Sequence, residues 1–164
     1  MLVPEERSDR RFLDYHRAHR DAAARQDEDS PQFQIPDAGH PYPRHSLPAL
    51  EAGVWVRDTH PDRFADFDLA IFEAFFGRTE DISDLDVLRR LADRCGLDGA
   101  ALAEGIRGPR CRGRVLAEYR DALALGIRGV PAVTLPGRTP IVGAVPYRDL
   151  KRAVEDALQG SGRT

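Results

Sequence analysis

Apolar residues recur at helical spacing along most of the first 126 positions, and an alternating strand-like pattern appears only after them. The strongest stripe follows Pro61, a residue suited to a first helical turn, and contains Phe64, Phe67, Ile71, Ala74 and Phe75. Gly77 ends this pattern. The spacing predicts a helix over 61–77 with one side facing a hydrophobic core.

Similar stripes, with a capping residue or proline at the start and glycine near the end, predict helices over 8–26, 46–59, 83–96, 98–106 and 109–126. Ser8, Ser46 and Asp98 are expected N-caps, and Ser83 is expected to form a capping box with Asp86. Leu47, Leu50 and Val54 are expected on the core side of the 46–59 helix. Prolines at positions 31, 36, 41 and 43 predict an irregular segment over 27–45.

Strands are predicted over 132–135 and 139–142, where two short apolar runs flank Pro136-Gly137-Arg138 as in a β-hairpin. Pro131 precedes the first run, and proline is tolerated in sheets only at a strand start or an edge. The Val130-Pro131 bond can be cis, since X-Pro bonds have only a weak trans preference. The last helix is predicted over 146–159, with an inward face of Tyr147, Leu150, Val154, Ala157 and Leu158.

Charge, hydropathy and cysteine content indicate which partners and which compartment to expect. Basic and acidic residues are interspersed and the net charge is −3, so no basic face indicates nucleic-acid binding. We find no apolar run of membrane-spanning length and no apolar signal core, so we expect no membrane partner and a cytoplasmic location. In that reducing compartment Cys95 and Cys111 are expected to be free thiols.

Three sequence segments together resemble a known family: HSLPALEAG (45–53), FDLAIFEAFFGRTEDISDLDVLRRLADRCGLD (67–98) and ALALGIRGVPAVTLPGRTPIVGAVPYRDL (122–150). They resemble DsbA-like thioredoxin-fold proteins, in the cytosolic branch of FrnE-like proteins and 2-hydroxychromene-2-carboxylate isomerases. The resemblance implies a single α/β, thioredoxin-like domain over 1–164. Its parts would be a large helical insertion (44–125) and a unit of cis-proline loop, hairpin and C-terminal helix (126–159). The first βα unit would be missing or incomplete.

The resemblance also implies a substrate-binding loop of Gly129, Val130 and Pro131. Val130 would offer its main chain to an extended substrate, and Pro131 would shape the pocket. The alternative interpretation is that Val130-Pro131 only begins an edge strand. Main-chain pairing of this kind makes little demand on the substrate's sequence.

The reactive dithiol of the family has no counterpart in this chain. Cys95 and Cys111 lie 16 positions apart and cannot form a C-x-x-C pair. Cys95 lies at a helix end, where the dipole disfavours a thiolate, whereas Cys111 lies at a helix start beside arginines. We therefore expect no catalytic residue, with Cys111 as the one thiol to consider and a buried inert side chain as its alternative. The arginine-rich run over 108–114 is either an anion site or a solvated helix start.

Several functions remain open at this point. One is a relative of thiol-disulfide oxidoreductases that lacks its dithiol and is inactive as given; the others are a relative of glutathione-dependent isomerases (kappa-class transferase-like) and a redox-dead binding protein. Whether the chain is an enzyme stays undecided. We expect no cofactor and no metal, and a substrate that is an extended peptide, a thiol or a small molecule. Because a lone hairpin is marginal, we expect either a natural start upstream of Met1 or a homodimer that covers its edge.

Overall fold

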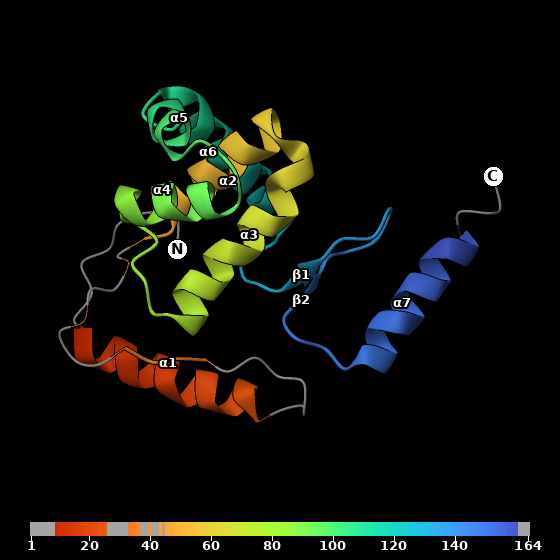
Figure 1. Ribbon diagram of the computed structural model, residues 1–164. Helices are drawn as coiled ribbons and strands as arrows, with labels where there is room; N and C mark the ends of the chain where they lie inside the picture. Colours follow the sequence, from red (N-terminus) through yellow and green to blue (C-terminus); the bar gives the residue numbers. More distant parts are fainter. Residues whose placement is uncertain (1–8, 26–32, 37–39, 41–42, 44, 161–164) are drawn as a thin grey trace. The chain divides into compact units, whose positions relative to one another are not determined.

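The computed structural model describes residues 9–25, 33–36, 40, 43 and 45–160. It divides into two compact units, residues 1–115 and 116–164, and one helix runs across the boundary. The helices and strands, labelled in Figure 1, are α1 (Asp9–Ala24), α2 (Leu47–Thr59), α3 (Phe64–Phe72), α4 (Leu85–Arg94), α5 (Gly99–Gly105), α6 (Pro109–Ala124), β1 (Ala132–Val133), β2 (Ile141–Val142) and α7 (Tyr147–Gly160). The expected cap Ser8 lies outside the described residues.

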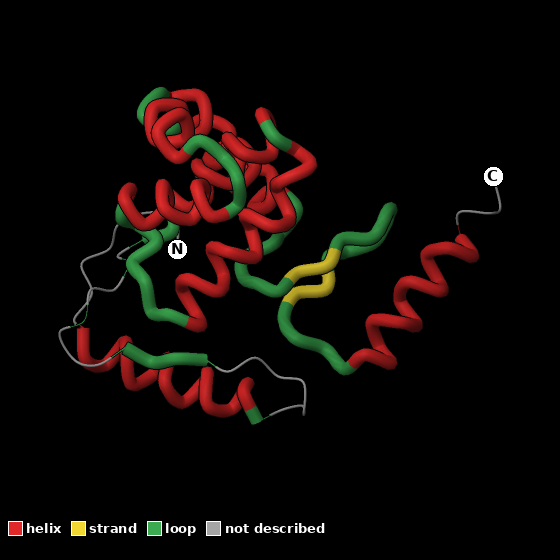
Figure 2. Tube along the Cα trace, in the orientation of Figure 1, coloured by secondary structure: helices red, strands yellow, loops and turns green. Residues whose placement is uncertain are grey.

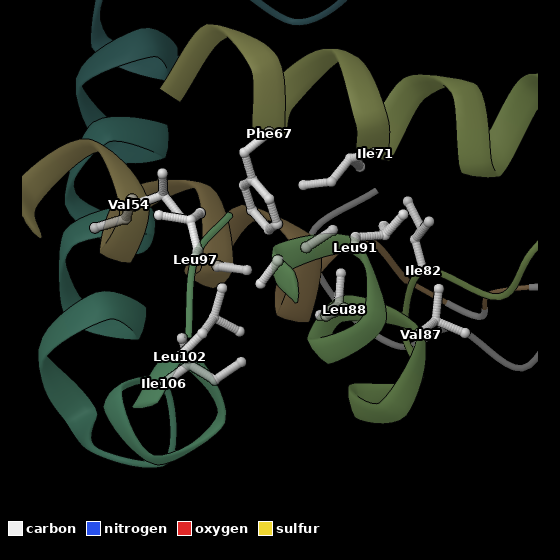
Figure 3. Close-up of a cluster of buried hydrophobic side chains, with 14 of the residues drawn as sticks. Val54, Phe67, Ile71, Ile82, Val87, Leu88, Leu91, Leu97, Leu102 and Ile106 are labelled. Atoms are coloured by element: carbon white, nitrogen blue, oxygen red, sulfur yellow. The ribbon is translucent and has the colours of Figure 1, made fainter. Parts of the chain in front are cut away.

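Four helices supply most of the core of the first unit, and the buried Cys111 and Val115 of α6 complete it. Helix α2 contacts α3, α4 and α5, and α4 contacts α3 and α5. Phe67 and Ile71 point from α3 into the middle of the cluster in Figure 3. Burying one such side chain contributes about 1.5–3 kcal/mol, so this cluster is the main source of stability. The largest fully buried side chains are Phe67, Leu88, Leu91, Leu102 and Val56.

The predicted 61–77 helix consists of three segments. A 3-10 turn (Pro61–Arg63) leads into α3, and a π-helical turn (Glu73–Gly77) follows it. The predicted core stripe is confirmed, because Phe67, Ile71 and Ala74 are buried and the other two members, Phe64 and Phe75, pack against the core.

The starts of α4 and α5 are fixed by aspartates. The Asp98 carboxylate accepts hydrogen bonds from the N–H groups of residues 100 and 101, as predicted. The predicted cap Ser83 is wrong: Asp84 caps α4 and accepts a 2.8 Å hydrogen bond from the Asp86 N–H. The reason is local, since the Asp81 carboxylate already accepts the Ser83 N–H at 2.9 Å and holds Ser83 in the preceding turn.

Two close approaches set the spacing of the helices in the first unit. The N–H of Gly99, the first residue of α5, donates to the Asp93 carboxylate of α4 at 2.9 Å. Gly105, the last residue of α5, lies against the indole of Trp55, leaving no room for a Cβ. Trp55 is half-buried, packs against the core and is the chain's single tryptophan.

Helix α7 differs from the expectation that one face points inward. None of residues 147–159 is buried; Tyr147 is 77% and Leu158 70% exposed. The hairpin is too small to cover the apolar side of so long a helix. Among the described residues, no helix has the length and apolar character needed to cross a membrane.

Candidate functional site

The loop that contains Gly129, Val130 and Pro131 is positioned by a helix end on one side and a hairpin on the other. Helix α6 ends at Ala124, and Gly126, two residues further on, has a φ of 81°. The Gly126 N–H donates to Leu123 and the Ile127 N–H to Ala122, both at 3.0 Å. This pair of hydrogen bonds defines the Schellman motif, in which glycine tolerates the left-handed conformation. The helix stop predicted at Gly126 is confirmed.

The hairpin after the loop is real but shorter than predicted. Ala132 pairs with Val142 and Val133 with Ile141 in an antiparallel ladder, seen as the short yellow strands in Figure 2. The predicted strands over 132–135 and 139–142 are therefore too long. A turn closed by Arg138 N–H donating to Leu135 O at 3.1 Å takes up the residues between them. Prolines at positions 136 and 140 supply no N–H for a ladder there.

The loop itself presents Val130 to solvent. Val130 is 90% exposed, and the Val130-Pro131 bond is cis, as predicted. The Pro131 carbonyl accepts a 2.8 Å hydrogen bond from the Gly143 N–H. Among the described residues, no hydrogen bond uses the main chain of Val130. Pro131 is thus anchored to the hairpin, whereas the neighbouring N–H and carbonyl of Val130 are available.

The two thiols lie in other places and in unreactive settings. Cys111, in the first turn of α6, is 4% exposed, and burial is the largest cause that raises the pKa of its thiol. Cys95 follows α4 and is half-buried; burial and then the charge of Asp66 raise the pKa of its thiol. Both side chains are therefore neutral thiols near pH 7. The favourable helix-start setting expected for Cys111 is outweighed by desolvation.

The arginine-rich run at the start of α6 is engaged by carboxylates of α2. Arg112 Nε donates to the buried carboxylate of Glu51 at 2.6 Å. Arg110 and Arg114 bind Asp58 at 3.3 and 3.2 Å. These pairs fasten α6 to α2, and they use the charges that the anion-site interpretation required. Within the described part of the chain, no three histidine, cysteine or acidic side chains are grouped to hold a metal ion.

Sequence reasoning overlooked one exposed feature of the first unit. Leu69 and Phe72 on α3 are more than half exposed although both are large and apolar. Their spacing from Ala65, at i+4 and i+7, was the available signal, but the stronger core stripe of the same helix hid it.

The comparisons with known proteins agree with this architecture. A crystal structure described as a putative protein disulfide isomerase from Nitrosomonas europaea superposes with a TM-score of 0.70 at 24% sequence identity. The match covers 98% of this chain and 78% of that chain, and it shows that the two share a fold. No curated protein sequence matches the chain. A family model described as the DSBA-like thioredoxin domain matches residues 43–155, which is more than half of the sequence. The chain is therefore a member of the DSBA-like thioredoxin domain family, in a mostly helical form with few strands.

Proposed function

We propose that this DsbA-like chain binds an extended polypeptide through the loop of Gly129, Val130 and Pro131, without dithiol chemistry of its own. The observation that carries the proposal is the exposed Val130 main chain, which no described residue uses, at the entry of an edge strand. An extended peptide lying along this edge would exchange main-chain hydrogen bonds with Val130. Such pairing gives affinity that depends little on side chains.

The roles of the three residues are distinct in this proposal. Pro131 has no N–H, and its carbonyl is held by the Gly143 N–H, so it fixes the loop instead of pairing with the peptide. Val130 supplies one donor and one acceptor. Gly129 lies close to the hairpin, since a Cβ built on it would be 3.9 Å from the Val142 side chain.

The two thiols of the 164-residue sequence support the proposed absence of dithiol chemistry. Thiol-disulfide exchange begins with a thiolate, and resolution by a second thiol needs a partner nearby. Cys95 and Cys111 are 16 positions apart, and the pKa of each thiol is raised by burial. Free thiols of this kind fit a reducing, cytoplasmic compartment. Among the described residues no strand pairs with the outer edge of β2, which supports a second copy as the partner that covers that edge.

The binding test compares two substitutions at the same position. Val130→Ala keeps the main-chain N–H, whereas Val130→Pro removes it. The probe is a fluorescein-labelled, reduced and carboxymethylated insulin B chain, titrated with the full chain and followed by fluorescence anisotropy. We expect Val130→Ala to change the Kd by less than about twofold and Val130→Pro to weaken binding about tenfold, the loss of one hydrogen bond. Far-UV circular dichroism checks that both variants are folded. Equal binding by the two variants, or no binding by the parent chain, refutes the proposal.

The redox part is tested separately by insulin reduction with dithiothreitol. We expect no acceleration above the uncatalysed rate by the parent chain. Any acceleration of insulin reduction by the parent chain contradicts the proposed absence of dithiol chemistry. Cys95→Ser and Cys111→Ser variants then show whether either thiol is responsible.

A further inference from the structure

Helix α3 carries two apolar faces, and only one of them is used by the core. Phe67 and Ile71 are buried in the cluster of Figure 3. Ala65, Leu69 and Phe72 form a second row, at i, i+4 and i+7, which we call the outer stripe. All three are exposed, and Leu69 and Phe72 retain 58% and 53% of their accessible surface. An exposed row of large apolar side chains indicates an interaction surface.

The outer stripe is held firmly at its C-terminal end. The Phe72 ring stacks on Phe76 with centroids 6.1 Å apart and an interplanar angle of 6°. Phe76 in turn meets Phe75 edge-on at 4.7 Å. The Arg20 guanidinium from α1 lies 4.9 and 5.0 Å from the centroids of Phe75 and Phe76. Since these contacts fix Phe72 in advance, a partner would pay little entropy to order it.

Carboxylates line both edges of the outer stripe. By helical geometry, Asp68 lies beside Phe72 on one edge, while Asp66 and Glu73 lie beside Leu69 on the other. No lysine or arginine occurs from residue 64 to 73. Arg78 reaches Glu73 at 3.6 Å from the following segment. Burial raises the pKa of the Asp68 carboxyl, the direction that a nearby cation would reverse.

We infer that the outer stripe is a docking surface for a basic amphipathic helix of a partner protein. Leucine-like side chains of such a helix would cover Leu69 and Phe72, and its flanking lysines or arginines would meet Asp66 and Asp68. An anionic membrane surface is excluded by the same carboxylates. A second copy of this chain is a poorer match, because its exposed helix α7 carries three basic and three acidic residues and thus no net charge. This inference does not depend on the proposed peptide-binding loop.

The test uses a labelled model peptide of about 18 residues, with leucines at i, i+3, i+4 and i+7 and lysines elsewhere. A matched peptide carries glutamate in place of lysine. Binding to the full chain is measured by fluorescence anisotropy at low and at physiological salt. We expect the lysine peptide to bind, more weakly as salt rises, and the glutamate peptide not to bind.

Substitutions on α3 locate the binding site. We expect Leu69→Ser/Phe72→Ser to weaken binding of the lysine peptide at least about tenfold. Asp66→Asn/Asp68→Asn should weaken it at low salt and flatten its salt dependence. The control Leu125→Ser alters another leucine with 58% exposure, in the second unit, and should bind like the parent chain.

Several results overturn the inference. These are equal binding by the parent chain and Leu69→Ser/Phe72→Ser, equal loss in Leu125→Ser, equal binding of the glutamate peptide, and no binding of the lysine peptide at about 1 mM. Sedimentation of the parent chain as a dimer that Leu69→Ser/Phe72→Ser dissociates would also overturn it, because the occupant would then be a second copy.

Discussion

The close approach of α5 to α4 predicts that alanine at position 99 destabilises the first unit, although alanine is the better helix former. A Cβ built on Gly99 would lie 2.5 Å from the carbonyl oxygen of Arg89 and 2.8 Å from the Asp93 carboxylate. An unstrained contact needs about 3.5 Å, so the two helices must separate by about 1 Å. The obstacle at Arg89 is main chain, which a rotamer change cannot move aside.

The magnitude follows from two opposing effects. Overpacking of this kind costs about 1–3 kcal/mol, and the same displacement strains the hydrogen bond between the Gly99 N–H and Asp93. Replacing glycine by alanine in a helix returns about 0.5–1 kcal/mol. The net loss should be about 1–2 kcal/mol, which corresponds to a fall in Tm of about 2–8 °C for a chain of this length.

The matched control is Gly113→Ala in α6, where a Cβ would meet no atom within 4 Å. This substitution should raise stability by about 1 kcal/mol through helix propensity alone. Thermal unfolding followed by far-UV circular dichroism measures both variants against the parent chain. A Gly99→Ala protein as stable as the parent, with Gly113→Ala stabilised as expected, would refute the packing argument.

Other substitutions probe the core, the α2–α6 ion pair and the half-buried carboxylate of Glu80. Leu88→Ala should cost about 2–5 kcal/mol in urea unfolding because Leu88 is fully buried, whereas Leu125→Ala should stay within about 0.5 kcal/mol of the parent. Arg112→Met leaves the carboxylate of Glu51 buried without its cation; since the Arg112 side chain is 59% exposed, we expect the low end of a charged hydrogen bond, about 1.5 kcal/mol. A double-mutant cycle with Glu51→Gln that shows no coupling would contradict this. Burial alone would raise the pKa of Glu80, but its hydrogen bonds and charges with Arg78 and Arg90 outweigh this and lower it. The ionised Glu80 carboxylate therefore contributes its full stabilisation above pH 4.5, and this stabilisation is lost as the pH falls through the lowered pKa of the folded protein. Acid should reduce the urea midpoint of the parent more than that of Glu80→Gln.

Local signals in the sequence predicted the parts of the structure that depend on near neighbours. The α3 core stripe, the Asp98 cap, the glycine stop at Gly126 and the hairpin after Pro131 are all confirmed. Each of these rests on a spacing or a turn residue within a few positions.

The errors concern features that depend on what surrounds an element. Leu50 was expected in the core but is 42% exposed, because α2 is buried mainly through its small residues, Ala49, Ala52 and the two valines at 54 and 56. A helix surrounded on several sides shows no clean apolar stripe. The pairs of Arg112 with Glu51 and of Arg114 with Asp58 join residues 61 and 56 positions apart, which spacing rules do not reach.

For the candidate site, the sequence placed the loop of Gly129, Val130 and Pro131 at the entry of the hairpin, and the structure has it there. Its use as a binding surface stays a prediction, as does the division of a single domain at residues 125 and 126. The burial of Cys111 could not be read from the helix-start position, since desolvation depends on the neighbouring α2 and α5 side chains.

The position of Trp55 gives the protein a built-in optical reporter of one unit only. The indole lies against Gly105 in the 1–115 unit, and the 116–164 unit contains tyrosines but no tryptophan. Emission excited at the red edge of indole absorption therefore follows the opening of α2 from α5 and is blind to the melting of α7. If tryptophan emission and a signal from α7 changed at different points during unfolding, the two units would be unfolding independently.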